Sequence, residues 1–228
     1  MQARSDAQAV RVWDLPTRTF HWLLSVAVIL AVVTAKIGGN ALVWHMRLGL
    51  LVLALLVFRL VWGFVGGHWS RFASFLYAPS SVLAYLRGHA GPQGHWEVGH
   101  SPLGALSVFA LLLLLSAQVA TGLVADDEVA TTGPLNRFVD SAVALKATGW
   151  HKNFGQYLII SLVVLHIAAV LFYQFRKRRN LIGPMWHGDA FTPPGTPPSA
   201  DGVWQRTRAA VLLAAALGLS WWIARLGS

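Results

Sequence analysis

The sequence has no cysteine and few charged residues. Without cysteine the chain has no disulfides, no thiolate-ligated iron–sulfur cluster and no covalently attached c-type haem, all of which require that residue. Only 12% of its 228 residues are charged, while 55% are hydrophobic and the mean hydropathy is +0.54. This balance indicates an integral membrane protein that resides in the lipid bilayer rather than a soluble domain.

The net charge of +9 does not indicate nucleic-acid binding, because the basic residues lie beside apolar segments and form no stripe. Their distribution instead fits the excess of Lys and Arg in cytoplasmic loops. The amino-terminal segment carries charges and lacks a small-residue cleavage site, so we expect it to be retained. The pattern predicts a multi-pass membrane protein with a cytoplasmic N-terminus and, with five spans, a C-terminus on the outer side.

Five apolar segments are long enough to cross a bilayer as helices. They cover about Leu15–Ile37, Ala41–Val65, Ser101–Val124, the run from Trp150 to the basic block Arg176–Arg179, and Val203–Ile223. A shorter apolar piece at 78–86 is expected at the membrane interface.

The fold class predicted from these segments is an all-α integral membrane protein, with a four-helix transmembrane bundle and a fifth, C-terminal transmembrane helix. The bundle occupies residues 1–180 and the fifth helix residues 203–228. Residues 181–202 are expected to form a Pro/Gly-rich cytoplasmic linker, whose stretch PPGTPPSADG (193–202) should be extended and unpacked. Asp14 is a candidate N-cap of the first helix. Arg59 is expected to extend to the interface, and no buried carboxylate is predicted.

Four histidines lie at matching depths in the predicted helices. His151 and His166 are about 22 Å apart along one helix, with His151 near the outer face and His166 toward the inner face. Helix direction places His21 at the level of His166, and His45 at the level of His151. A single His near a helix end is more often an interfacial polar residue. His166, however, lies in a wholly apolar run, where an ionisable residue is costly and indicates function.

These depths predict two ligand pairs, His21 with His166 and His45 with His151. Facing imidazoles from a bundle can hold a metal in its core, and two neutral imidazoles make a six-coordinate, low-spin haem iron. Gly49 and Gly155 follow His45 and His151 by four residues, on the same helix face, and there they would leave room for a flat macrocycle.

Haem propionates need cations near the interface. Arg18 and Arg71 are candidates for the inner haem and Arg47 for the outer one, although ordinary positive-inside charge explains Arg18 and Arg71 equally well. His100 ranks third as an inner ligand, after His21 and His166. A substrate or propionate role suits it better, and a plain interfacial role better still. The histidines expected to be solvated are His68, His89, His95 and His187.

Five sequence pieces carry a family resemblance: VWDLPTRTFHW (12–22), WHMRLG (44–49), HWSRFASF (68–75), GHSPLGALS (99–107) and HKNFGQYLIISLVVLH (151–166). Together they resemble the prokaryotic di-haem cytochrome b family, which includes bacterial cytochrome b561 and the b-type cytochrome subunits of nickel–iron hydrogenases. The resemblance implies a four-helix core with two haem b groups that moves electrons between a quinone pool and a redox partner. It also implies location in the bacterial inner (cytoplasmic) membrane, so that the outer side, with the C-terminus, is periplasmic. Its motifs carry the iron ligands onto His21, His45, His151 and His166. The fifth helix departs from the pattern.

The function expected from these features is electron transfer across the membrane, between quinone and a periplasmic cytochrome c or a catalytic subunit. The partner is expected to dock against the loop at 125–149. One alternative is a stand-alone quinone-linked oxidoreductase acting on a small oxidant such as superoxide. Another is a transition-metal transporter, which is disfavoured because Met46 and Met185 do not line up with the buried histidines. The quinone, the direction of electron flow and the oligomeric state, including a homodimer, are left open by the sequence.

Overall fold

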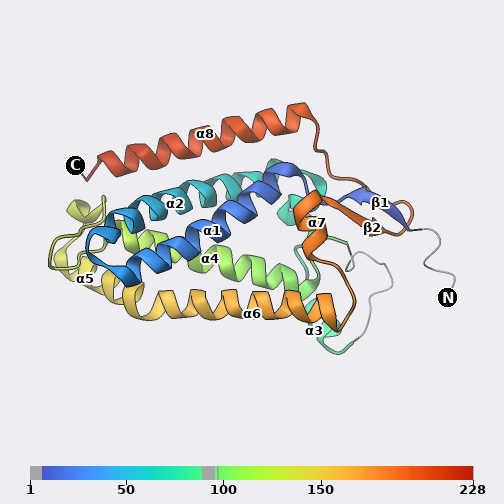
Figure 1. The fold of residues 1–228 in the computed structure, drawn as a ribbon, viewed down its shortest axis with the longest axis horizontal. Coiled ribbons are helices and arrows are strands. Elements are labelled where there is room, and N and C mark those ends of the chain that lie inside the picture. The colour runs from blue at the N-terminus through green and yellow to red at the C-terminus, as the bar shows by residue number, and fades with distance from the viewer. Residues whose placement is uncertain (1–6, 89–95, 97, 228) are drawn as a thin grey trace. The chain divides into compact units, whose positions relative to one another are not determined.

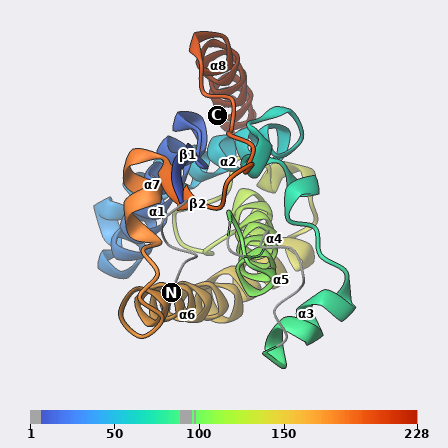
Figure 2. The ribbon, with the colours of Figure 1, turned by 90° about the vertical axis from the view of Figure 1, so that its right-hand side faces the viewer.

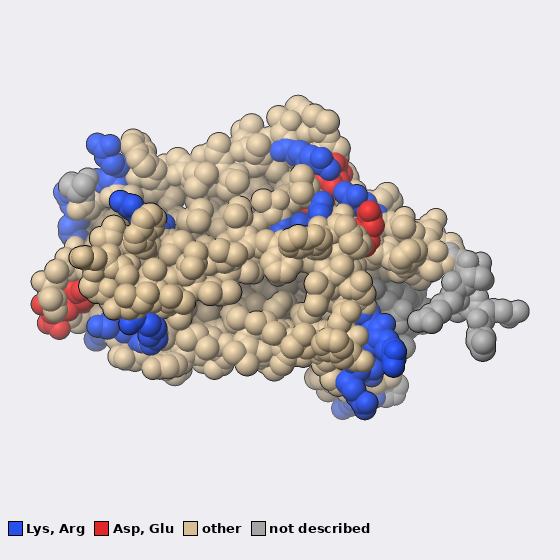
Figure 3. Space-filling model, viewed as in Figure 1, with Lys and Arg blue, Asp and Glu red and all other residues tan. Residues whose placement is uncertain are grey.

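Five long helices make up most of the computed structural model, which describes residues 7–88, 96 and 98–227. Each is long and apolar enough to cross a membrane, as the sequence predicts. They are α1 (Leu15–Ile37), α2 (Leu42–Val65), α4 (Pro102–Val124), α6 (Gln156–Phe175) and α8 (Val203–Arg225), drawn in Figure 1. On the face shown in Figure 3, the surface over the middle of α6 is uncharged, as a lipid-facing helix requires.

The chain divides into two compact units. The first comprises Met1–Thr19, Leu60–Ala110 and Leu165–Ala209, and the second comprises Phe20–Arg59, Leu111–Val164 and Ala210–Ser228. Of the five long helices, α2 is the most buried. Its most apolar window is 44% buried, whereas those of the other four are 6% to 17% buried. The buried apolar residues of α2 lie in the second unit, except for Trp62, which belongs to the first.

The ends of α1 follow from local chemistry. Asp14 Oδ1 accepts a 2.8 Å hydrogen bond from the Thr17 backbone N–H, which satisfies one of the free donors of the first turn and confirms Asp14 as the cap. At the other end Gly38 and Gly39 have φ of +70° and +53°. Only glycine adopts such values readily, so the chain leaves the helix there and turns into α2.

The fourth span begins earlier than the sequence predicts. Helix α5 (Ser141–Gly149) passes through a π-helical segment, Trp150–Gly155, directly into α6. Gly149 has helical angles, φ −58° and ψ −45°, and therefore does not end the helix. A glycine inside a helix costs only about 1 kcal/mol, which the surrounding contacts outweigh. The predicted loop at 125–149 is accordingly a loop only up to Asp140.

The segment after α6 is packed, and the prediction that its Pro/Gly-rich stretch 193–202 is unpacked is wrong. Helix α7 (Ile182–His187) leads into β2 (Asp189–Thr192), which pairs antiparallel with β1 (Gln8–Arg11); Figures 1 and 2 both show the two strands together. Further along, the Pro197 carbonyl accepts a 2.8 Å bond from Trp69 Nε1. Proline lacks an N–H donor but keeps its carbonyl, so an extended Pro-rich segment can still be held by donors from the bundle.

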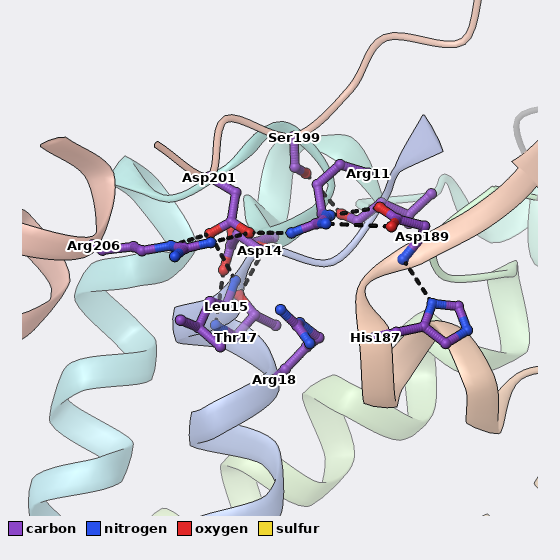
Figure 4. A network of polar contacts seen from close by, with 12 residues as sticks. Arg11, Asp14, Leu15, Thr17, Arg18, His187, Asp189, Ser199, Asp201 and Arg206 are labelled. Carbon is purple, nitrogen blue, oxygen red and sulfur yellow. Dashed lines mark hydrogen bonds and ion pairs between the residues drawn. The ribbon is translucent and has the colours of Figure 1, made fainter. Parts of the chain in front are cut away.

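Charged side chains hold this segment against the start of α1 (Figure 4). Arg11 contacts Asp189 at 2.6 Å and Asp201 at 2.5 Å, and Asp201 also binds Arg206 and the Leu15 N–H. The hydrogen bond from Arg11 keeps the pKa of Asp189 below its ordinary value. Burial raises the pKa of Asp201, but the hydrogen bonds from Arg206, Leu15 and Arg11 outweigh it, so this pKa is lowered as well.

Asp14 is fully buried, contrary to the expectation of no buried carboxylate. Besides capping α1, it accepts bonds from Ser70 Oγ at 2.6 Å, the Gly67 N–H at 3.1 Å and Trp62 Nε1 at 3.3 Å. A carboxylate is tolerated in the interior only when such donors surround it. Asp14 therefore ties the beginning of α1 to the turn that ends α2.

The eight-residue helix α3 (Pro79–Leu86) matches the short apolar piece expected near the interface. Its interfacial location, and the division of the chain at residues 180 and 202, stay predictions.

Acidification should release the segment that contains β2. Because the pKa values of Asp189 and Asp201 are lowered in the folded state, their ion pairs stabilise fully above the ordinary carboxyl range, near pH 4, and lose their effect as the pH falls through the folded pKa values. Hydrogen exchange of the β1 and β2 amides, corrected for the intrinsic rate, should rise below about pH 4.

Asp201→Asn should accelerate the hydrogen exchange of the β1 and β2 amides roughly tenfold already at pH 6, through the loss of about 1–2 kcal/mol of local stability. Asp140→Asn is the control, because Asp140 is exposed and makes no capping bond. Equal exchange in Asp201→Asn and wild type would contradict the role of these ion pairs.

Candidate functional site

The structure brings His45 and His151 together. His45 lies in the first turn of α2 and His151 in the π-helical segment, and both belong to the second unit. Their ring centroids are 5.8 Å apart and the ring planes are almost perpendicular, at 84°. The closeness of these two rings agrees with the pairing that helix depth predicts.

Backbone carbonyls determine the tautomer of both rings. His45 Nδ1 lies 2.9 Å from the Ala31 carbonyl oxygen, and His151 Nδ1 lies 2.9 Å from the Gln118 carbonyl oxygen. A carbonyl oxygen only accepts hydrogen bonds, so Nδ1 carries the proton in each ring and donates it. The lone pair of each neutral imidazole is then on Nε2, where it can bind a metal.

The geometry of the pair suits one metal between two imidazoles. An imidazole nitrogen binds a metal at about 2 Å, so two rings on opposite sides of one ion have centroids roughly 6 Å apart. The observed 5.8 Å is close to that value. Within the described part of the chain, no three His, Cys, Asp or Glu side chains gather as a metal site. Two imidazoles are a donor set that could hold a haem iron.

Helix α4 supplies residues that the sequence analysis missed. Gly122 lies against the imidazole of His151, and a Cβ on it would be only 2.8 Å from Cε1 of that ring. Thr121 Oγ1 is 3.4 Å from His151 Nδ1, and the Gln118 side chain donates a 2.9 Å bond to the His151 carbonyl. The spacing of these residues, one turn of the helix, is the only signal in the sequence that could have suggested a common face.

Gly49 and Gly155, both predicted to leave room for a cofactor, differ in the space beside them. No atom lies within 4 Å of a Cβ built on Gly49, so the space beside it is open. A Cβ on Gly155 would meet Gln118 Oε1 and Trp150 Nε1. The missing side chain of Gly155 thus makes room for Gln118 and Trp150, and its contact with a cofactor stays a prediction.

His21 and His166 belong to different units, and their pairing stays a prediction. His21 is half-buried in the second unit, with its ring edge-on to Trp22 at 5.1 Å and its carbonyl accepting a bond from Ser25 Oγ. His166 is half-buried in the first unit, within α6.

The predicted propionate partners have contacts of their own. Arg18 Nη1 donates to the Trp186 carbonyl at 2.6 Å, and Arg71 lies 3.5 Å from His68 Nδ1. Arg47 is exposed and its guanidinium lies 5.0 Å from the centre of the Trp44 ring.

Arg59 was expected to reach the interface, but it is buried, with 3% of its surface exposed. Arg59 lies six residues before α2 ends at Val65, on the most buried of the five long helices. The packing around that helix, and not distance from its end, keeps the side chain from the surface.

His100 lies among aromatic side chains in the first unit. Its ring centroid is 4.4 Å from that of Phe75 and 4.8 Å from that of Trp13, and its carbonyl accepts a bond from the Tyr77 hydroxyl. His68 packs on Trp69 and is half-buried rather than solvated, whereas His187 is exposed as expected. The predictions for His89 and His95 fall outside the described residues.

Comparison with known proteins gives a family and several relatives. The model of the family described as "Prokaryotic cytochrome b561" matches residues 12–188. A "Probable Ni/Fe-hydrogenase B-type cytochrome subunit" of Cupriavidus necator is 24% identical over 212 residues, which cover 79% of this chain and 86% of that protein. A "Probable Ni/Fe-hydrogenase 1 B-type cytochrome subunit" of Escherichia coli K12 is 23% identical over 223 residues, 82% of this chain and 94% of the relative. No solved structure matches the chain significantly.

Gly122→Ala should distort the site and destabilise the protein. The added methyl group would be 2.8 Å from His151 Cε1, so the ring or α4 must move, at a cost of about 1–3 kcal/mol. The measurement is the apparent unfolding temperature in detergent. Gly218→Ala in α8 is the control, because its Cβ would meet nothing within 4 Å. An unchanged unfolding temperature in Gly122→Ala would contradict the close packing of α4 on His151.

Proposed function

Because the chain belongs to the prokaryotic cytochrome b561 family, we propose that it carries electrons across the membrane through two haem b groups. The family and the five apolar helices establish a multi-pass membrane cytochrome of b type. The number of haems, their ligands and the redox partners are the parts proposed here.

His45 and His151 are proposed to hold one haem, called the outer haem below. The observation that supports this assignment is the pair of Nδ1 bonds to the Ala31 and Gln118 carbonyls, which leave both Nε2 lone pairs available to a metal. Both rings are thereby restrained before a metal binds, so little ordering is left for the binding step to cost. Bound haem supplies one-electron redox chemistry; the protein's contribution is to hold, orient and shield it.

His21 and His166 are proposed to hold the second, inner haem. Support comes from the sequence: the two residues lie at one depth, and His166 is an ionisable residue inside an apolar helix. Arg18 and Arg71 in the first unit are proposed to pair with the inner propionates, and Arg47 near His45 with the outer ones. A guanidinium suits a carboxylate because it can donate two parallel hydrogen bonds.

Electrons are proposed to pass between the quinone pool and a periplasmic partner, either a cytochrome c or a catalytic subunit. The relatives named as nickel–iron hydrogenase cytochrome subunits support a catalytic subunit. The proposed docking surface is the loop 125–140 with α5. This loop is well ordered by its own bonds: Asp127 accepts from the N–H groups of Val129, Ala130 and Thr131, which lower its pKa to about 2. A periplasmic loop implies a cytoplasmic N-terminus, as the basic residues predict.

Histidine variants test the two-haem assignment. The purified protein should show b-type bands in a reduced-minus-oxidised spectrum and contain two haems per chain. His166→Ala should remove the inner haem and keep much of the outer one, because each haem has its own pair of histidine ligands. His151→Ala should remove the outer haem and keep much of the inner one. His100→Ala is the control and should keep both haems. Absence of b-type bands would contradict the proposed function, and two haems retained in His166→Ala would contradict the pairing.

Gly49→Ala tests whether a ligand occupies the space beside His45. Without a ligand the new methyl group meets no atom, and Ala in place of helical Gly should stabilise the protein by about 1 kcal/mol. With haem in that space the methyl group should clash and lower the content of outer haem. Gly218→Ala in α8 is the matched control, since its Cβ also meets nothing within 4 Å. Equal haem content in Gly49→Ala, Gly218→Ala and wild type would show that the cofactor lies elsewhere.

A further inference from the structure

We propose that Gln118 positions His151 for the outer haem, and that its side chain controls the affinity and midpoint potential of that haem. This inference rests on the proposed role of His151 as an iron ligand. Gln118 lies on α4, which carries none of the four proposed ligands, and it has no other function in the proposed mechanism.

Gln118 and His151 make two hydrogen bonds to each other, in opposite directions. The Gln118 carbonyl accepts from His151 Nδ1 at 2.9 Å, and Gln118 Nε2 donates to the His151 carbonyl at 2.9 Å. The first bond restrains the imidazole ring and the second restrains the backbone that carries it. Two bonds between the same residues leave the ring far less freedom than either bond alone.

The backbone at His151 needs such a restraint because it is not α-helical. His151 lies in the π-helical segment Trp150–Gly155, whose backbone hydrogen bonds span five residues instead of four. Single π-helical turns are rare and occur often at functional sites. A carbonyl oxygen has two lone pairs, so the His151 carbonyl can accept the Gln118 amide in addition to any bond within its own helix.

The position of the Gln118 amide costs stability, because it leaves buried polar atoms unsatisfied. Such a cost indicates that the amide has a function at this position. Gln118 Oε1 and Trp150 Nε1 are both buried and have no hydrogen-bond partner in the part of the chain that the structure describes. Both atoms lie against Gly155, where any side chain would collide with them. A buried polar atom left without a partner costs about 1–3 kcal/mol. Glycine at position 155 is thus required for the Gln118 amide to reach His151, and the two buried atoms, Gln118 Oε1 and Trp150 Nε1, are left without hydrogen bonds there.

The effect of Gln118 on a haem follows from the chemistry of metal-bound histidine. Groups that hydrogen-bond or orient a ligating imidazole change its basicity and its orientation at the metal, and their loss typically lowers metal affinity 10–100-fold. Hydrogen bonding around the ligands is also one of the means by which a protein sets a haem potential. Replacing the Gln118 side chain leaves the Nδ1 bond in place, because its acceptor is a backbone carbonyl. The tautomer is therefore retained while the position of the ring is relaxed.

The test compares Gln118→Met with Gln174→Met in the full-length protein. Methionine has nearly the shape of glutamine without its amide. Gln174, on α6 in the first unit, also has a buried Oε1, so the control removes a comparable amide away from His151. Haem content, midpoint potentials and the electron paramagnetic resonance of the ferric haems are measured. The signals that survive in His166→Ala identify the outer haem. Gln118→Asn, which keeps an amide one methylene shorter, is the second variant.

Gln118→Met should keep both haems, with the outer haem bound about tenfold more weakly. If this loss falls on one oxidation state only, the outer potential should shift by about 59 mV. The outer ferric signal should change, the inner haem and Gln174→Met should match wild type, and Gln118→Asn should be intermediate.

Unchanged outer-haem affinity, potential and resonance in Gln118→Met would overturn the inference while leaving the proposed function intact. Loss of both haems in Gln118→Met and Gln118→Asn would also overturn it, since Gln118 would then serve the fold as a whole. A wild-type protein without haem would overturn the proposed function and this inference together.

Discussion

Two backbone carbonyls, those of Ala31 and Gln118, determine what the His45–His151 pair can do. An imidazole inside a membrane helix could satisfy its polar atoms in many ways, and most of them would leave it useless as a ligand. Here the acceptor is a main-chain oxygen, which cannot rotate away or change protonation. The direction of each Nε2 lone pair thus depends on the relative positions of helices, and the packing of α1 against α2 and of α4 against the π-helical segment is itself part of the site.

The helices consequently divide the work. α2 and the π-helical segment provide the imidazoles, whereas α4 provides the surroundings: a carbonyl, an amide and a glycine whose bare face lies against the His151 ring. Ser220 in α8 donates a 2.6 Å bond to the Leu50 carbonyl of α2, within two turns of His45. The fifth helix, the part of the chain that departs most from the family pattern, is therefore attached directly to a helix that carries a proposed ligand.

Apolar length and histidine depth were enough to predict the five helices and the closeness of His45 to His151, because both depend only on distance along a helix. The rotation of α4 could not be predicted. Apart from a few small or uncharged polar residues that helix is apolar, and lipid and protein interior accept the same side chains, so no hydrophobic stripe distinguishes its faces. Gln118 was invisible for this reason. The predictions for Asp14 and the segment after α6 failed for a different reason. Composition describes what a residue type prefers, whereas the burial of these residues depends on donors from Ser70, Gly67 and Trp69, far away in the sequence.

The pairing of β1 with β2 has a consequence for the order of events during synthesis. The paired residues of the two strands are about 180 positions apart in the sequence, and four membrane spans lie between them. At 5–20 residues per second, a ribosome needs roughly 10 to 40 s to deliver β2 after β1. During that time Arg11 lacks both of its carboxylate partners, Asp189 and Asp201. The ion pairs of Arg11 therefore cannot stabilise the N-terminal segment until the fourth helix and β2 have been synthesised.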